Sequence, residues 1–291
     1  MKKQKKRKID LLVISDVHLG TFGCRAKELL NYLKSINPQV VVLNGDIIDI
    51  WQFNKRYFPK SHMKVIKYLT SLLAAGTKVY YVTGNHDEML RRFRGFQLGS
   101  LEIVNKVLIE LDGKTAWIFH GDVFDVSMKH SKWLAKLRGM GYDALIMINT
   151  LVNWVSEKMG RGRLSFSKKI KNGVKGAIKH INNFEETAAE IAISNGYHYV
   201  VCGHIHQPQM RKMTNKEGKE VMYLNSGDWI ENLTALEYYK GEWHMYEYRD
   251  EQHKDPHTEQ EQDKELEKAV YKNKQLFEQL VEEFQAVPQI K

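Results

Sequence analysis

The stretch IDLLVISDVH, residues 9–18, joins an apolar run to two side chains of types that can bind metal ions. Ile9 to Ser15 has the apolar, β-branched character of a buried strand, which predicts a strand followed by a loop. Asp16 and His18 come directly after that run. A carboxylate and an imidazole two residues apart can face one ion if the backbone bends between them, so this strand end is a candidate metal site.

Four further segments place oxygen or nitrogen ligands next to glycine, mostly after β-branched runs. They are Gly45-Asp46, Gly84-Asn85-His86-Asp87, His120-Gly121-Asp122 and Gly203-His204-Ile205-His206. Each segment alone is a weak signal, because such short patterns occur often by chance. Their order and their positions at strand ends predict a single site assembled from across the chain.

The first part of the chain alternates strand-like and helix-like segments. In order they are Ile9 to Ser15, Arg25 to Ile36, Val40 to Leu43, Ser61 to Ala75 and Lys78 to Val82. This βαβα order predicts an α/β layered fold with buried parallel strands. Leu101 to His120 then reads as short strands with a turn at Asp112-Gly113.

The sequence predicts helices in the middle of the chain and strands after them. The predicted helices are Lys129 to Leu137, Asp143 to Met159 and Ser167 to Asn195, and the later strands are Tyr197 to Cys202, Val221 to Leu224, Thr234 to Tyr239 and Trp243 to Tyr248. We therefore expect one domain over residues 9–248 with a helical cap inserted at about 124–195. Residues 249–291 read as a charged tail with a helix near Leu266 to Phe284.

The composition limits the class of protein. The chain has 291 residues, 43% of them hydrophobic, which is enough for a large core. Its net charge of +9 fits a polyanionic partner: a nucleic acid, a phosphate-rich substrate or an anionic membrane. Two cysteines, Cys24 and Cys202, are too few for a disulfide framework. The few cysteines favour a cytoplasmic protein, and with no apolar run long enough to span a bilayer we expect only peripheral association with a membrane.

The ligand chemistry favours a pair of transition-metal ions. The carboxylate of Asp46 has two oxygens and can bridge two cations about 3.5–4 Å apart, as in two-metal phosphatases. Imidazoles with few carboxylates suit Mn²⁺, with Fe or Zn as alternatives, better than Ca²⁺ or Mg²⁺. Such a site keeps residual positive charge, which suits a phosphate.

Taken together, these segments resemble those of the calcineurin-like metallophosphoesterases. The resemblance implies a four-layer αββα sandwich with an inserted helical cap. It also implies two ligand sets. Asp16, His18, Asp46 and His206 would hold one ion, and Asp46, Asn85, His120 and His204 the other.

The expected reaction is hydrolysis of a phosphoester or phosphoanhydride. A metal-bridging hydroxide would attack phosphorus in line while the ions neutralise the developing charge. His86 is the candidate general acid, and Asp87 is expected to fix its tautomer. The alternative for His86 is a structural role behind the ligands.

A narrower resemblance is to the UDP-2,3-diacylglucosamine pyrophosphohydrolases of lipid A synthesis. It rests on six segments: residues 120–125, 131–135, 165–171, 184–185, 203–208 and 225–229. The resemblance implies cleavage of a pyrophosphate to release UMP and a diacylated sugar phosphate. Ser165, Lys168, Lys171 and Arg91 are candidate substrate contacts.

The cap composition agrees with a lipid substrate. The apolar face of residues 143–159 is expected to line an acyl slot, or simply to pack against its neighbours. The basic side chains that follow it are expected to meet anionic groups, or to form a solvated face.

One departure from this branch keeps other functions open. His86 stands where the branch commonly has arginine. A nuclease, a cyclic-nucleotide phosphodiesterase or another phosphodiesterase is therefore an alternative, although the chain contains no recognisable nucleic-acid module. A non-catalytic scaffold is a further alternative. The presence of all seven expected ligands argues against it, because loss of ligands would mark such a scaffold.

Overall fold

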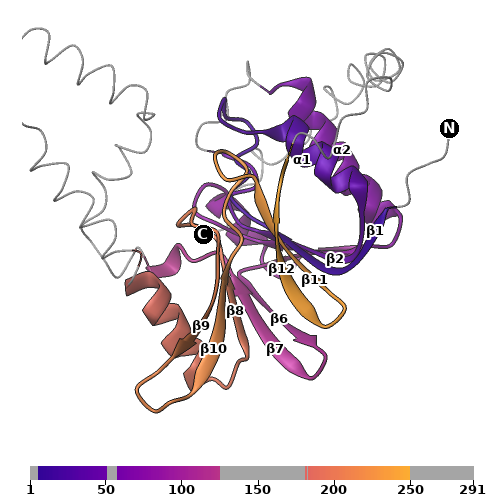
Figure 1. Ribbon diagram of the computed structural model, residues 1–291. Helices are drawn as coiled ribbons and strands as arrows, with labels where there is room; N and C mark the ends of the chain where they lie inside the picture. Colours follow the sequence, from indigo (N-terminus) through magenta and orange to yellow (C-terminus); the bar gives the residue numbers. More distant parts are fainter. Residues whose placement is uncertain (1–5, 51–57, 125–180, 182, 250–291) are drawn as a thin grey trace, which may run out of the picture.

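The computed structural model describes residues 6–50, 58–124, 181 and 183–249, and its strands form two sheets (Figure 1). The larger sheet has the order β12-β11-β1-β2-β3-β5-β4. Its strands are β1 (Arg7–Ile14), β2 (Ile36–Asn44), β3 (Lys78–Val82), β4 (Gln97–Leu98), β5 (Leu101–Val104), β11 (Thr234–Tyr239) and β12 (Glu242–Glu247). Strands β1, β2, β3 and β5 run parallel, so their carboxyl ends meet along one edge.

The smaller sheet has the order β6-β7-β8-β10-β9. Its strands are β6 (Lys106–Leu111), β7 (Lys114–Phe119), β8 (Tyr199–Cys202), β9 (Gln209–Thr214) and β10 (Glu220–Asn225). The central strands β7, β8 and β10 are parallel, while β6 and β9 pair antiparallel at the two edges. The β6–β7 connection turns at Asp112-Gly113, as the sequence predicts.

Helices cover the outer faces of the two sheets. Figure 1 shows α1 (Ala26–Ser35) and α2 (Lys60–Ala74) on the larger sheet, and the helix of residues 183–194 beside the smaller one. A short 3₁₀ helix, η1 (Glu88–Phe93), follows β3. The helical spacing of apolar residues in α1 explains its position, because Leu29, Leu30 and Leu33 are all buried against the sheet.

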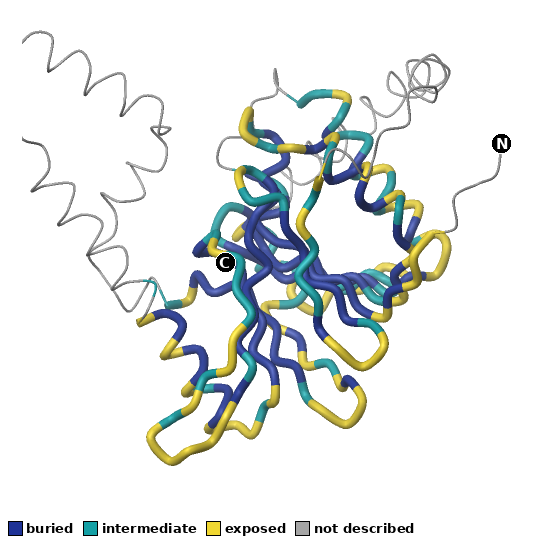
Figure 2. The backbone as a smooth tube through the Cα atoms, in the orientation of Figure 1, coloured by how far each residue is buried: buried dark blue, intermediate teal, exposed yellow. Residues whose placement is uncertain are grey.

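Three apolar clusters separate the four layers. One lies between the two helices and the larger sheet, and includes Leu33 and Val41. A second joins the facing sides of both sheets, and includes Val13 and Val201. The third packs Phe184 and the helix of residues 183–194 onto the smaller sheet. In Figure 2 the buried residues, coloured dark blue, lie in the centre of the molecule. The predicted αββα sandwich is therefore confirmed.

The βαβα order and the later strands also agree with the sequence analysis, with two strands missed, the two-residue β4 and β9. Strand β9, with the sequence QMRKMT, is half exposed and carries no buried face, so it lacks the alternation that marks a strand. The predicted cap lies outside the described residues apart from its ends, as does the predicted tail at 250–291. No helix in the described ranges is long and apolar enough to cross a membrane.

Candidate metal centre

The seven expected ligands lie just past the carboxyl ends of five strands. Asp16 and His18 follow β1, Asp46 follows β2, and Asn85 follows β3 in the larger sheet. His120 follows β7 of the smaller sheet, and His204 and His206 follow β8. Both sheets end at this point, so the site is built between the two sheets rather than on one of them.

The backbone of five of these residues is left-handed. The φ angles of Asp16, His18, Asp46, His204 and His206 are 51°, 52°, 53°, 68° and 53°. This region is unfavourable for residues with a Cβ, and each such residue costs about 1–3 kcal/mol. Strain repeated at five residues of one site points to a geometry selected for function rather than for local stability.

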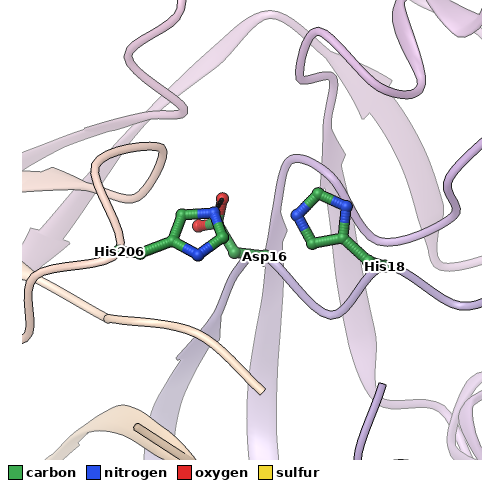
Figure 3. A group of neighbouring side chains, drawn as sticks. All are labelled: Asp16, His18 and His206. Atoms are coloured by element: carbon green, nitrogen blue, oxygen red, sulfur yellow. Dashed lines mark ion pairs between the residues drawn. The ribbon is translucent and has the colours of Figure 1, made fainter. Parts of the chain in front are cut away.

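Asp16, His18 and His206 form a first group of potential ligands. One ligand atom from each lies within 4.8 Å of those of the others. The Nε2 atom of His206 is 3.1 Å from Asp16 Oδ1, and Figure 3 shows the Asp16 carboxylate next to the His206 ring, with the His18 ring on its other side. The Nε2 atom of His18 is buried and forms no hydrogen bond with any residue that the structure describes. Burying such an atom is unfavourable unless it is paired, so this nitrogen fits a cation.

Asp46, His120 and His204 form a second group with the same 4.8 Å limit. Nε2 of His120 is 3.2 Å from Asp46 Oδ2. On the other side of the ring, His120 Nδ1 lies 2.9 Å from the carbonyl oxygen of Asn44. A carbonyl accepts, so Nδ1 carries the proton and Nε2 is left as the ligand atom, as in many metal-binding histidines.

A third group links the other two. His18, Asp46 and His86 also bring one ligand atom each within 4.8 Å of one another. Asp46 therefore belongs to two groups and stands between them. Its position fits the bridging role that the sequence analysis assigned to it.

The charges of the site favour cations. Burial alone would raise the pKa of Asp46, but the adjacent imidazole of His120 outweighs burial and lowers that pKa to about 2. Burial likewise opposes ionisation of Asp16, yet His206 holds its pKa well below the usual range. Burial lowers the pKa of His120, and the Asp46 carboxylate raises it well above the ordinary value. The same negative charge that favours a proton on the ring would favour a divalent cation in its place.

The Asn85 loop approaches the second group through a glycine. A Cβ built on Gly84 would lie 2.3 Å from Asp46 Oδ1 and 2.9 Å from His120 Cδ2. Only a residue without a side chain permits this approach. The backbone N–H of His86 also donates to Asp46 Oδ1 at 2.8 Å. Asn85, which lies between Gly84 and His86, is thus carried next to the second group.

The carboxylate beside His86 is Asp49, which corrects the sequence-based assignment of Asp87. Asp49 is buried, and its Oδ2 lies 2.9 Å from His86 Nδ1 and 3.4 Å from His18 Nδ1. Burial lowers the pKa of His86, but contact with Asp49 raises it above the ordinary value. One carboxylate therefore faces a candidate ligand and the candidate acid together.

Asp87 instead stabilises the loop that carries Asn85 and His86. Its carboxylate accepts hydrogen bonds from the Tyr81 hydroxyl and the backbone N–H groups of Ile47 and Gly84, at 2.7, 3.0 and 2.6 Å. These bonds connect the Asp87 carboxylate to strand β3, to its own loop and to the loop after β2. Its role is to join two ligand-bearing loops, which adjacency to His86 in sequence does not reveal.

The candidate substrate contacts are only partly described. Arg91, on η1, forms an ion pair with Asp122, two residues after His120, and so lies at the edge of the site. Ser165, Lys168 and Lys171 lie outside the described residues.

The structure adds two carboxylates that the sequence analysis did not assign. Asp49 lies three residues after Asp46, and this nearness in sequence to a predicted ligand was the one signal that could have identified it. Asp228 is fully buried, its Oδ2 is 3.8 Å from His206 Nδ1, and its Oδ1 accepts from the N–H groups of Ile230 and Glu231. Asp228 thus supports the loop that faces His206.

Comparison with known proteins gives the family. The UDP-2,3-diacylglucosamine hydrolase of Aliivibrio fischeri (strain MJ11) is 23% identical over 240 residues, 78% of this chain and 94% of its own. That of Wigglesworthia glossinidia brevipalpis is 26% identical over 243 residues, 78% of this chain and 89% of its own. Among solved structures, the E. coli phosphoesterase Yfce matches with a TM-score of 0.40 at 13% identity, covering 82% of this chain and 99% of its own.

The model of the calcineurin-like phosphoesterase family matches residues 9–208, which include all seven candidate ligands. This match confirms the resemblance seen in the sequence. Membership implies divalent metal ions, and the three ligand groups described above supply places for them. The chain therefore belongs to the calcineurin-like phosphoesterase family and is a hydrolase of phosphoesters or phosphoanhydrides.

Proposed function

We propose that this protein is a binuclear metal-dependent phosphohydrolase that cleaves the pyrophosphate of UDP-2,3-diacylglucosamine. The observation that carries the metal chemistry is the position of Asp46, which belongs to two of the three ligand groups. The substrate is supported by relatives named UDP-2,3-diacylglucosamine hydrolase, which align over most of their length.

The two ligand groups define the proposed metal sites. Asp16, His18, Asp46 and His206 would hold one ion, and Asp46, Asn85, His120 and His204 the other. The donor set of imidazoles, an amide and two carboxylates suits Mn²⁺, with Fe or Zn as alternatives. When bound, such ions supply Lewis-acid stabilisation of phosphoryl oxygens and lower the pKa of a coordinated water.

His86 is the proposed proton donor, with Asp49 as its positioning residue. The ion-pair contact of 2.9 Å between Asp49 Oδ2 and His86 Nδ1 would orient the ring and leave Nε2 for the substrate. From Nε2 the ring would donate a proton or a hydrogen bond to the oxygen that leaves phosphorus. A ligand atom of His86 lies within 4.8 Å of those of His18 and Asp46, so the ring is in reach of a phosphate held there.

Substrate recognition is assigned to the edge of the site and to the cap. Arg91 would contact a phosphate while Asp122 keeps it in place. Ser165, Lys168 and Lys171, in the proposed cap at about 124–195, would meet the remaining polar groups. The cap belongs to the proposed domain of residues 9–248, followed by a tail at 249–291.

A second candidate function is hydrolysis of another phosphodiester, including a nucleic acid. One observation favours it: His86 stands where the lipid A branch commonly has arginine. A histidine at this position supplies a proton, whereas an arginine would supply only fixed charge.

The test is hydrolysis of UDP-2,3-diacylglucosamine by the purified chain with Mn²⁺, beside an Asp46→Ala variant. We expect release of UMP by the wild type and loss of at least about 10³-fold in the variant, because Asp46 serves both ligand groups. Hydrolysis of bis(p-nitrophenyl) phosphate is measured in parallel. If this generic diester is cleaved and UMP is not released, the metal site stands and the substrate is wrong.

A further inference from the structure

Exposed apolar side chains are concentrated in the segment that runs from η1 to the edge strand β4 of the larger sheet. Three of the six exposed large hydrophobic side chains in the described part of the chain fall within residues 88–98: Met89, Phe96 and Leu98. Their exposed fractions are 46%, 49% and 64%. Scattered single apolar residues are ordinary on a surface, whereas three exposed ones within one short segment are a candidate for an interaction site. We call residues 88–98 the edge segment.

The edge segment is also basic. It contains Arg91, Arg92 and Arg94, with Glu88 as its single acidic residue. Arg91 is neutralised by Asp122. Arg92 and Arg94 are exposed, and neither has an ion-pair partner among the residues that the structure describes. Two guanidinium groups therefore remain available beside the exposed apolar side chains.

The edge segment begins at the metal centre and follows the sheet margin. η1 starts directly after Asp87, and the chain then returns along β5, where the N–H of Gly95 donates to Ile103 at 2.8 Å. Strand β4 is the last strand of the sheet and has only two residues. So short an edge offers little backbone for pairing with a strand of another protein.

We propose that the edge segment docks this protein on an anionic lipid surface. Arginine with interleaved Phe, Leu and Met is the composition of an interfacial segment, in which the cations meet headgroups and the apolar side chains enter the acyl boundary. A nucleic acid would use the arginines but would leave Leu98 and Met89 without apolar partners. This docking is independent of the substrate, because it requires no turnover.

The test measures binding of the full-length protein to vesicles of phosphatidylcholine with and without phosphatidylglycerol. Each basic residue near an anionic surface contributes about fivefold in affinity, so Arg92→Gln/Arg94→Gln weakens binding about thirtyfold. High salt screens the electrostatic part of vesicle binding and leaves the apolar part. Phe96→Ser/Leu98→Ser should weaken this remaining binding. The matched controls are Lys216→Gln/Lys240→Gln, on exposed turns elsewhere, and Leu108→Ser on β6. Both controls should bind like the wild type.

Hydrolysis of bis(p-nitrophenyl) phosphate shows that each variant is folded, and it separates this proposal from the proposed function. Unchanged hydrolysis with lost vesicle binding supports the docking surface whatever the natural substrate is. The proposal is overturned if the wild type ignores anionic vesicles, or if the edge variants bind them as tightly as the controls do. Retained vesicle binding with weakened binding of a short DNA duplex would overturn it in favour of a nucleic acid.

Discussion

Asp16 shows how a strained residue is held in a metal site. Its φ of 51° is unfavourable, yet three bonds fix it. Its N–H donates to the Gly45 carbonyl at 3.1 Å, its carbonyl accepts from Trp229 N–H at 3.1 Å, and its Oδ2 accepts from His204 N–H at 3.0 Å. These partners come from three other loops. Because three tertiary hydrogen bonds fix its position, Asp16 can keep a backbone conformation that is unfavourable for an isolated residue of its type.

The negative charge of Asp49 should contribute to catalysis through its contact with His86. Asp49→Asn removes the charge beside His86 and His18, and we expect kcat to fall about 10–100-fold with little change in KM. His86→Gln should lower kcat as well. Because Asp49 acts on His86 as well as on His18, the two losses should be coupled, and the double variant should lose less kcat than the product of the two single losses.

Asp87→Asn is the control in this double-mutant cycle. Asp87 bonds to Tyr81, Ile47 and Gly84, so its replacement should lower the stability of the protein and act additively with His86→Gln. Steady-state kinetics of the wild type, the three single variants and the two double variants decide between the two carboxylates. Additivity for Asp49 and coupling for Asp87 would restore the sequence-based assignment.

At the scale of elements, the sequence predicted where the ligands lie better than how they are supported. Strand β3 was predicted with its observed bounds, and the five ligand segments all follow strands, because apolar runs and glycines are local signals. Asp49 was missed since its partner His86 is distant in sequence, with α2 and β3 between them, and no local pattern joins the two. Strand β9 was missed because its side chains are largely polar. Pairing between sheets is a tertiary property that no local pattern contains.

The glycine at the end of β2 gives the element-scale prediction. Gly45 has a φ of +79°, and a Cβ there would lie 2.3 Å from His120 Nδ1. Gly76, after α2, has a φ of +89° and nothing within 4 Å of the same atom. Both alanine variants carry backbone strain of about 1–2 kcal/mol, but only Gly45→Ala must also displace His120 from the Asn44 carbonyl.

Urea unfolding and calorimetric titration with Mn²⁺ measure the two effects separately. Gly76→Ala should lose about 1–2 kcal/mol of stability and bind Mn²⁺ like the wild type. Gly45→Ala should lose about 1–3 kcal/mol more and bind Mn²⁺ at least tenfold more weakly. Equal metal binding by the two variants would show that His120 is not a ligand.

At the scale of the whole molecule, the metal centre closes the junction between two sheets. The sheets share an apolar cluster, but their carboxyl ends meet mainly through charged and polar side chains. Asp16 contacts His206, and Asp46 contacts His120, so each ion pair joins the larger sheet to the smaller one. Each proposed ion would have ligands from both sheets, and it would therefore stabilise the sandwich as well as act on substrate.

This arrangement predicts that metal binding raises the unfolding temperature of the domain. A ligand at a hundredfold excess over its Kd stabilises a protein by about 2.7 kcal/mol, which corresponds to roughly 5–10 °C for a domain of this size. Differential scanning calorimetry should show this rise on adding Mn²⁺ to chelator-treated protein, and its reversal by EDTA. Asp46→Ala should show a much smaller rise, because both ligand groups lose a member. If the wild type and Asp46→Ala respond equally, the stabilising ions bind elsewhere, and the junction between the sheets is held by its side chains alone.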